Sequence, residues 1–299
     1  MAFAKANLNY AKEYSQALAQ AYPYTLYFGA LWSATKPDVK FLNNNTVILP
    51  SLTVKGRSNG DRDTIGSFAR NFNNAEESKT LKTHRTWNTL VHPRDIDETN
   101  HVASIQNITK VMNEEQKFPE MDAEMITALY SLKNALEAVS EDDVLTAANV
   151  LTKFDKMMDK MDEKRVPGSG RLLYVDTYTK TLIDTAKDVV RTSGNSVLGR
   201  TVSRIDEVEV INVPTSAMKS KFNLKADDGF EVAADAKAVK MMLIHPSVVI
   251  PAITYDFAEL GLPSALSQGK YTYFEESFED VFIYNKKHDA IQFYIEKQS

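Results

Sequence analysis

The chain has 299 residues, of which 43% are hydrophobic and 25% charged, and its formal net charge is -5. This length and composition allow a sizeable core in one large or two ordinary domains, and the mild acidic excess excludes an overall attraction to nucleic acid or anionic membranes. The absence of cysteine excludes disulfides, thiolate zinc sites and cysteine nucleophiles and suits synthesis in a reducing cytoplasm. We expect no signal peptide, and no membrane span, because the longest apolar run, residues 241–253, is short and contains prolines.

The first part of the chain predicts an arm. Residues 1–22 place apolar side chains at approximately helical spacing, and Pro23 ends that pattern. Residues 24–32, YTLYFGALW, are rich in aromatic and branched side chains and favour an extended or buried conformation. A terminal segment of this kind is often disordered unless a partner holds it, so we expect a contact with another molecule.

A protruding hairpin is predicted next. Residues 46–55, TVILPSLTVK, predict a strand in which Pro50 requires an edge or a bulge. Residues 56–85 contain three glycines and few apolar anchors, so they cannot form a core and are too long for an ordinary connection. The strand-like run TVILPSLTV leads into this segment and KTLKTHRTWNTLV leads out of it. We therefore interpret the segment as part of a long two-stranded hairpin, which is unstable without a second molecule.

Two helices are predicted in the middle of the chain. Pro119 and the acids after it predict a helix start and a helix of about 20 residues. Its apolar stripe consists of Met125, Leu129, Leu132, Leu136 and Val139. Ser140 and Asp143 predict the start of a second helix. Its stripe consists of Val144, Ala148, Leu151, Met158 and Met161, with the methionines interpreted as core residues.

From residue 165 the pattern is mixed. RLLYVD predicts a short strand, and Asp176 or Thr177 predicts a cap for the helix that follows. Alternating or aromatic runs predict further strands that begin near residues 208, 238, 248, 270, 280 and 290. The chain is therefore expected to be α+β, with an arm, a hairpin, long helices and a sheet-rich second half.

The stretch 84–101 concentrates groups that can bind metals or transfer protons. These groups are His84, His92, Asp95, Asp97, Glu98 and His101. A metal-dependent enzyme that uses this cluster is one alternative, although Asp95 and Asp97 lack the glycine and distant glutamate of a calcium loop. The structural alternative is that Pro93 stops a strand, that Asp97 or Thr99 caps the following helix, and that arginines pair with the acids. The sequence has no phosphate-binding loop, GxSxG elbow or HExxH pair, so we predict no enzymatic activity, cofactor or metal.

Several motifs follow one another in an order that resembles a known family. They are RDIDETN at 94–100, PEMDA at 119–123, VPGSGRLLYV at 166–175, IDEVEVINVP at 205–214 and MLIHPSVVI at 242–250, followed by the aromatic run DVFIYNKKHDAIQFYI at 280–295, interpreted as a final hairpin. This order resembles the major capsid proteins of tailed bacteriophages with the Hong Kong 97-like fold, in particular a group from phages of Gram-positive hosts. The body of the long loop departs from the family pattern.

The resemblance implies a fold with an N-arm at 1–40, an extended E-loop hairpin at 41–92, a P-domain at 93–140 and an A-domain at 141–269. The P-domain would contain a long spine helix and be completed by C-terminal strands at 270–299. The implied function is structural: hexamers and pentamers of an icosahedral shell that encloses double-stranded DNA without sequence-specific binding. The implied location is the virion, after assembly in the host cytoplasm. A separate scaffolding protein, a portal and head-completion proteins are the expected partners, and an encapsulin-like nanocompartment shell is the alternative with the same fold.

Charged residues of the hairpin and its base are the candidate intersubunit contacts. They are Lys55, Arg57, Arg62, Arg70, Arg85, Arg94, Asp95, Asp97 and Glu98. Under the resemblance, residues 84–100 form a joint whose charges set the loop angle and neighbour contacts during shell expansion. Some shells of this fold are cross-linked between a loop lysine and a P-domain asparagine, for which Lys55 and Asn285 are the candidates here.

Overall fold

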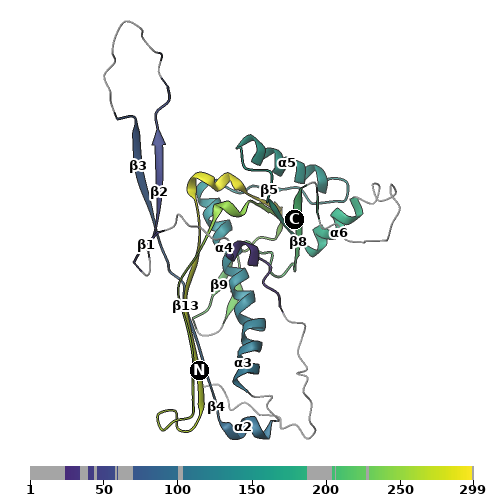
Figure 1. Cartoon of the computed structure of the whole chain (residues 1–299). Helices are drawn as coiled ribbons and strands as arrows, with labels where there is room; N and C mark the ends of the chain where they lie inside the picture. The colour runs from purple at the N-terminus through teal and green to yellow at the C-terminus, as the bar shows by residue number, and fades with distance from the viewer. Residues whose placement is uncertain are drawn as a thin grey trace.

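The computed structural model describes residues 24–33, 40–43, 46–57, 59, 70–99, 104–186, 204, 205, 207–226 and 229–297. Figure 1 shows a mixed α/β body from which one long hairpin projects. The predicted helix at 1–22 lies outside the described residues. None of the described helices combines the length and apolar composition that a membrane span needs.

The projecting hairpin is confirmed, but its returning strand differs from the prediction. β2 (Thr46–Val54) pairs antiparallel with β3 (Phe72–Thr80), and β1 (Lys40–Asn43) pairs only with the first part of β2. Pro50 lies past the residues of β2 that pair with β1, so no described strand pairs with β2 on that side of Pro50, which suits a residue without an N–H group. β4 (His84–Val91), expected to return along the hairpin, instead belongs to the body. The sequence FNNAEESKT of β3 lacks apolar alternation because most of its side chains are exposed.

A second sheet runs the length of the body in the order β12-β13-β4. Its longest strands are β12 (Val249–Gly261) and β13 (Tyr271–Ile283). β13 is one strand of 13 residues, where the sequence predicted two, because the acids in EESFED look like an interruption. Its outer partner is β4.

The third sheet has six strands and forms the centre of the larger core. Their order is β5 (Glu141–Asp142), β14 (Ile291–Glu296), β11 (Val239–Ile244), β6 (Leu172–Asp176), β8 (Val208–Val213) and β7 (Arg204–Ile205). The predicted final hairpin is wrong: β13 and β14 lie in different sheets and are joined by the 3-10 helix η4 (Asn285–Ala290). The C-terminal strand therefore shares a sheet with strands of the predicted A-domain, and the domain boundaries stay predictions.

Alternate residues of this sheet enter two cores. Leu173 and Val175 face a cluster with α5 (Val150–Glu163) and α6 (Thr177–Ala186). Leu172 and Tyr174 face a cluster with α4 (Phe118–Leu136) and α1 (Gly29–Trp32). This alternation is the two-residue period of a strand that is buried on both faces.

The long helix begins earlier than predicted. α3 (Ile105–Met112) continues through a π-helical turn, Asn113–Lys117, into α4, with helical backbone at Met112 and Lys117. Pro119 therefore lies within a continuous helix. The wider π-helical turn before it accommodates the proline, which has no N–H group to donate to the preceding turn. Of the predicted stripe, Met125 and Leu129 are buried, whereas Leu136 is exposed.

The second predicted helix also starts elsewhere. Residues Glu141–Asp142 form the short strand β5, Val144 is exposed, and α5 begins at Val150. Of the two methionines in the predicted stripe, Met161 is buried and Met158 is partly buried against the same core, which confirms that they are core residues. Met157, which was not in the predicted stripe, is also buried. Asp176 caps α6 as predicted, since its carboxylate accepts a hydrogen bond of 2.8 Å from the Thr179 N–H.

Two small elements complete the described chain. The strands β9 (Phe222–Leu224) and β10 (Phe230–Val232) form a hairpin beside α4, where the Thr127 hydroxyl accepts a hydrogen bond of 2.9 Å from the Phe222 N–H. α2 (Pro93–Glu98) lies at the far end of β4, and η3 (Pro246–Val248) precedes β12. In Figure 1 α2 and the hairpin lie at opposite ends of the molecule.

Candidate assembly interface

The outer half of the β2–β3 hairpin exposes apolar side chains. Leu52, Val54 and Phe72 are 61%, 69% and 52% exposed. Val54 pairs with Phe72, and Leu52 is two residues from Val54, so all three lie on one face of the hairpin. Large apolar side chains gathered on one face of a projecting hairpin are typical of a surface that another molecule covers.

The inner half of the hairpin is anchored to the body. Val47 and Leu49 are buried against Ile250, Ala252 and Phe282. The Lys79 ammonium donates a hydrogen bond of 3.2 Å to the side chain of Asn285. The hairpin therefore has a fixed root and an outer half without a core among the described residues.

The outer end of the hairpin is basic. Lys55, Arg57 and Arg70, three of the predicted contact residues, lie at or just beyond the ends of β2 and β3. The Arg70 guanidinium lies 4.7 Å from the ring centroid of Phe72. We call these three residues the basic end of the hairpin. Arg62 lies outside the described residues.

The charged residues predicted for the hairpin base pair within the chain, and they do not form one joint, since α2 lies at the opposite end of the molecule from the hairpin (Figure 1). Arg85 on β4 donates hydrogen bonds of 2.6 and 3.0 Å to Glu120 on α4, and two more to the carbonyl oxygens of Lys225 and Gly229. Arg94 pairs with Glu98 at 2.5 Å on the surface of α2. The predicted pairing of arginines with acids is confirmed for these two, while an intersubunit role of this group stays a prediction.

The local structure around α2 corrects one expectation. Pro93 does end β4, but it is also the first residue of α2, and the His92 ring accepts a hydrogen bond of 3.1 Å from the Arg94 N–H as N-cap. Asp97 lies inside α2, Thr99 is its C-cap, and Ser104 caps α3. The Asp95 carbonyl accepts a hydrogen bond from the Thr99 hydroxyl. Neither Asp97 nor Thr99 is therefore an N-cap.

The structure does not bring the described members of the His84–His101 cluster together. His84 lies at one end of β4, where it pairs with Glu276 at 2.7 Å and stacks on Phe278. His92 follows the other end of this strand of eight residues, about 25 Å away at the rise of a strand. His101 lies outside the described residues. Among the described residues, no three side chains of this cluster bring ligand atoms within 4.8 Å of one another, so the structure does not support the metal-dependent alternative.

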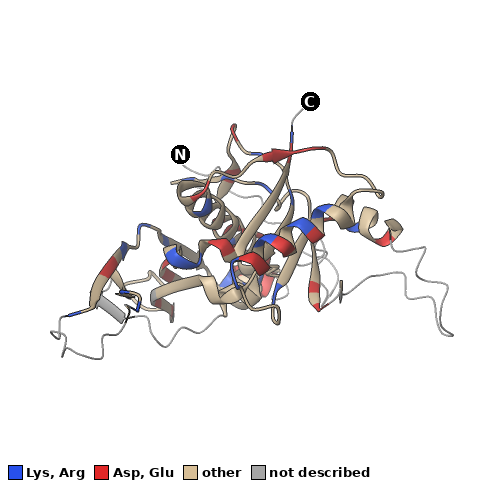
Figure 2. Cartoon of the chain, turned by 90° about the horizontal axis from the view of Figure 1, so that it is seen from above, with Lys and Arg blue, Asp and Glu red and all other residues tan. Residues whose placement is uncertain are grey.

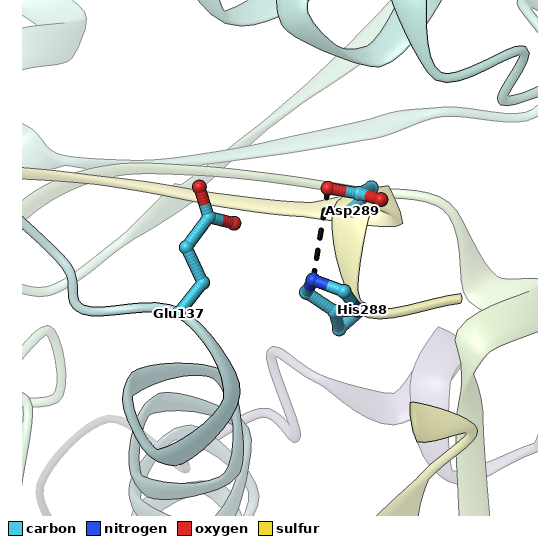
Figure 3. Close-up of side chains that lie close together, drawn as sticks. All are labelled: Glu137, His288 and Asp289. Carbon is cyan, nitrogen blue, oxygen red and sulfur yellow. Dashed lines mark ion pairs between the residues drawn. The ribbon is translucent and has the colours of Figure 1, made fainter. Parts of the chain in front are cut away.

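Another group of potential ligands lies elsewhere. Figure 3 shows Glu137, at the end of α4, facing His288 and Asp289 of η4. Each carboxylate already has a lysine partner: Lys133 at 2.5 Å from Glu137 and Lys164 at 3.6 Å from Asp289. The Lys133 hydrogen bond lowers the pKa of Glu137. The group is therefore accounted for by one ion pair at the end of α4 and another that connects the end of α5 to η4.

Buried carboxyl groups on α4 and β13 are functional candidates that were not predicted from the sequence. Glu124 and Glu279 are 8% and 5% exposed. Burial, followed by repulsion from Glu279, raises the pKa of Glu124 to about 8, and burial raises that of Glu279 to about 7. A signal was present, since acids at 122 and 124 flank an alanine within the apolar stripe of a predicted core helix.

Asp122, the first of these acids, holds the segment before α1. Its carboxylate accepts hydrogen bonds from the Tyr24 hydroxyl and from the Tyr27 and Phe28 N–H groups at 2.9–3.0 Å. Phe28, Leu31 and Trp32 are buried in the same core. The apolar side chains of residues 24–32 are therefore packed on their own chain rather than depending on another molecule, and 29–32 are helical rather than extended. A further contact of this segment with another copy stays a prediction.

The cross-link candidates are also separated within one chain. Lys55 follows the outer end of β2, whereas Asn285 contacts Lys79 at the root of the hairpin. A bond between Lys55 and Asn285 would need two copies and stays a prediction. Figure 2 shows lysines and arginines interspersed with acids along the elements of the body seen from above.

Comparison with known proteins identifies the fold. No family model matches the chain, and no curated protein matches its sequence. Solved structures match over nearly the full length. The cyanophage P-SCSP1u capsid structure has a TM-score of 0.70 at 10% identity, covering 97% of this chain and 93% of that one. The bacteriophage PhiM1 mature capsid has a TM-score of 0.66 at 13% identity, covering 97% and 93%. The Ralstonia phage GP4 capsid has a TM-score of 0.61 at 9% identity, covering 100% and 98%. The predicted α+β fold of tailed-phage major capsid proteins is therefore confirmed for this chain.

Proposed function

We propose that this chain is the structural subunit of a phage capsid shell. The observation that carries the proposal is the projecting hairpin, whose outer half exposes Leu52, Val54 and Phe72 on a chain with a capsid fold. Burying these side chains on a neighbouring copy would remove apolar surface from water, at about 25 cal/mol per Å². In this function the chain performs no catalysis.

The finer features follow from the same proposal. Subunits form hexamers and pentamers around rotation axes, through contacts in which different surfaces of two copies meet. The shell encloses double-stranded DNA in the virion, and the interspersed charges of Figure 2 suit a wall that does not retain DNA strongly. A separate scaffolding protein, a portal and head-completion proteins would be its partners, and assembly would occur in the host cytoplasm.

Sedimentation and electron microscopy of the purified chain test the proposal. We expect closed particles, built with a scaffold where one is required, that contain nuclease-protected DNA when isolated from infected cells. Particles that carry a protein cargo and no DNA would favour the nanocompartment alternative. A chain that stays monomeric at high concentration, with and without phage proteins, contradicts both functions.

A further inference from the structure

A cavity lies where the hairpin joins the body. It has a volume of about 330 Å³ and is lined by α4, β9, β13 and the segment between β3 and β4. Leu132, Phe222 and Leu224 contribute apolar walls, and Glu124 and Asp280 contribute carboxylates. We call this the acidic cavity.

Glu124 is incompletely satisfied in this cavity. Its side chain is 92% buried, since 8% is exposed, and it has a hydrogen bond with Thr83. Its Oε1 atom is buried without a hydrogen-bond partner in the described structure. A buried carboxyl oxygen without a partner is costly, so Glu124, whose side chain lines the cavity, has an acceptor that the described residues leave unused.

The chemistry of the walls identifies the class of ligand. The carboxyl groups of Glu279 and Asp280 lie close enough to Glu124 to raise its pKa by repulsion, and a bound cation would relieve this repulsion. The one basic residue of the cavity lining, Lys82, is exposed. The apolar walls suit an aliphatic stem. A lysine or arginine side chain provides both, because its methylene groups pack on apolar surface while its charged end binds carboxylates.

The hairpin places a matching group at its other end. Thr80, on the cavity wall, pairs with Thr46, whereas the basic end follows Val54 and precedes Phe72. The nine residues of β2 separate the two by about 30 Å at the rise of a strand. The basic end therefore cannot reach the acidic cavity of its own chain, which leaves it available to another copy.

We propose that the acidic cavity binds a basic side chain from the basic end of the hairpin of a second copy. This inference rests on the proposed function, in which the hairpin lies on a neighbour. Lys55, Arg57 or Arg70 would place its stem against the apolar walls and its charged group on Glu124 and Asp280. Because donor and acceptor lie at opposite ends of one hairpin, each copy binds the next, and the contact repeats around a closed ring.

Cysteine cross-linking tests this contact, since the natural chain contains no cysteine. Gly56→Cys places a thiol between Lys55 and Arg57, where an added Cβ meets no atom within 4 Å. Ser131→Cys places a thiol on the exposed part of the cavity wall. Assembled particles of the double variant, treated with oxidant or a short bis-maleimide, should give a ladder of covalent oligomers on denaturing gels.

Matched variants control the experiment. Gly56→Cys combined with Ser169→Cys, an exposed site outside the cavity lining, should give no ladder. Adding Glu124→Gln to the first pair should reduce the cross-linked fraction about tenfold, the scale of one charge-assisted hydrogen bond. Circular dichroism of each variant confirms that it is folded.

The outcomes separate this inference from the proposed function. Particles that form normally without a ladder for Gly56→Cys with Ser131→Cys overturn the cavity contact and leave the capsid function standing. A ladder that is unchanged by Glu124→Gln also overturns the role of the acidic cavity. Absence of any assembly overturns both proposals.

Discussion

Arg85 and Glu120 form a two-point contact between β4 and α4, with hydrogen bonds of 2.6 and 3.0 Å. The same guanidinium also donates to the carbonyl oxygens of Lys225 and Gly229. One side chain therefore connects the base of the hairpin to the long helix and to the β9–β10 hairpin. Such paired, charge-assisted bonds are stronger than neutral ones.

Arg85→Ala should destabilise the subunit. The change leaves the Glu120 carboxylate and two carbonyl groups without their donor, so we expect a loss of about 1–3 kcal/mol in the free energy of unfolding. Urea unfolding of the dilute chain measures this. Arg94→Ala is the matched control: its pair with Glu98 has side chains 79% and 38% exposed, so the loss should stay below about 1 kcal/mol. Equal losses for both variants would contradict the role of Arg85 as a stabilising contact between β4, α4 and the β9–β10 hairpin.

Asp122→Ala should release the segment before α1. Two backbone N–H groups and the Tyr24 hydroxyl lose their acceptor, and we expect a cost of about 2–4 kcal/mol, since one of these groups is fully buried. Limited proteolysis should cut near residues 24–28 faster than in the natural chain. Tyr24→Phe removes only one of the three bonds and should cost about 1 kcal/mol. Unchanged proteolysis of Asp122→Ala would show that the apolar contacts alone hold this segment.

The stability of the subunit should fall as the pH rises from about 4.5 to 8. Glu124 and Glu279 have folded pKa values of about 8 and about 7, whereas an unfolded glutamate titrates near 4.3. Between these values the folded chain binds protons that the unfolded chain has released, so each step upward in pH favours unfolding. The urea midpoint of the dilute chain should therefore be higher at about pH 5.5 than at about pH 8.

Glu124→Gln should flatten this pH dependence and raise stability at about pH 8, because the amide has no proton to lose. Glu137→Gln is the control. Lys133 lowers the folded pKa of Glu137, so the contribution of Glu137 to the free energy of unfolding is present above its unfolded pKa and is lost as the pH falls through its folded pKa. That variant should leave the slope between about pH 5.5 and 8 unchanged. A Glu124→Gln slope equal to that of the natural chain would show that this carboxyl group does not titrate in the window.

Leu52→Ser and Phe72→Ser should impair assembly without destabilising the subunit. Both side chains are mostly exposed in the single chain, so the free energy of unfolding, measured with urea, should change by less than about 0.5 kcal/mol. The yield of sedimenting particles should fall, because apolar contact with the neighbour is lost. Leu49→Ser is the contrasting variant: Leu49 is buried at the hairpin root, so stability itself should fall. Normal particle yields for Leu52→Ser with Phe72→Ser would contradict a role of this face.

The sequence predicted the buried strands best. β6 and β11 are short apolar runs, and β8 alternates apolar with polar residues. Their length of five or six residues favours a strand over a helix. β3 was missed because its side chains are mostly exposed, so its pairing is set by β2 rather than by its own pattern. The helix start was misplaced because Pro119 usually marks a first turn, and only the π turn before it permits a proline at this point.

The candidate site was less predictable than the fold. The charges around the hairpin base were identified, but the main partner of Arg85, Glu120, lies 35 residues further along the chain, and no local spacing indicates such a pair. Glu124 was missed because an acid beside an apolar stripe ordinarily points to solvent. Its burial depends on β13, which reaches α4 only in the folded chain.

Pro50 has a consequence for the subunit before it finds its neighbours. Along the outer part of β2, the edge opposite β3 has no strand partner among the described residues, and free edges of this kind recruit strands of other molecules into open-ended fibrils. A proline offers no N–H group for such a pairing. The same residue that bars a further strand thus protects a crowded pool of newly made subunits from irregular aggregation, while both apolar and basic side chains of the hairpin stay available for the intended contact.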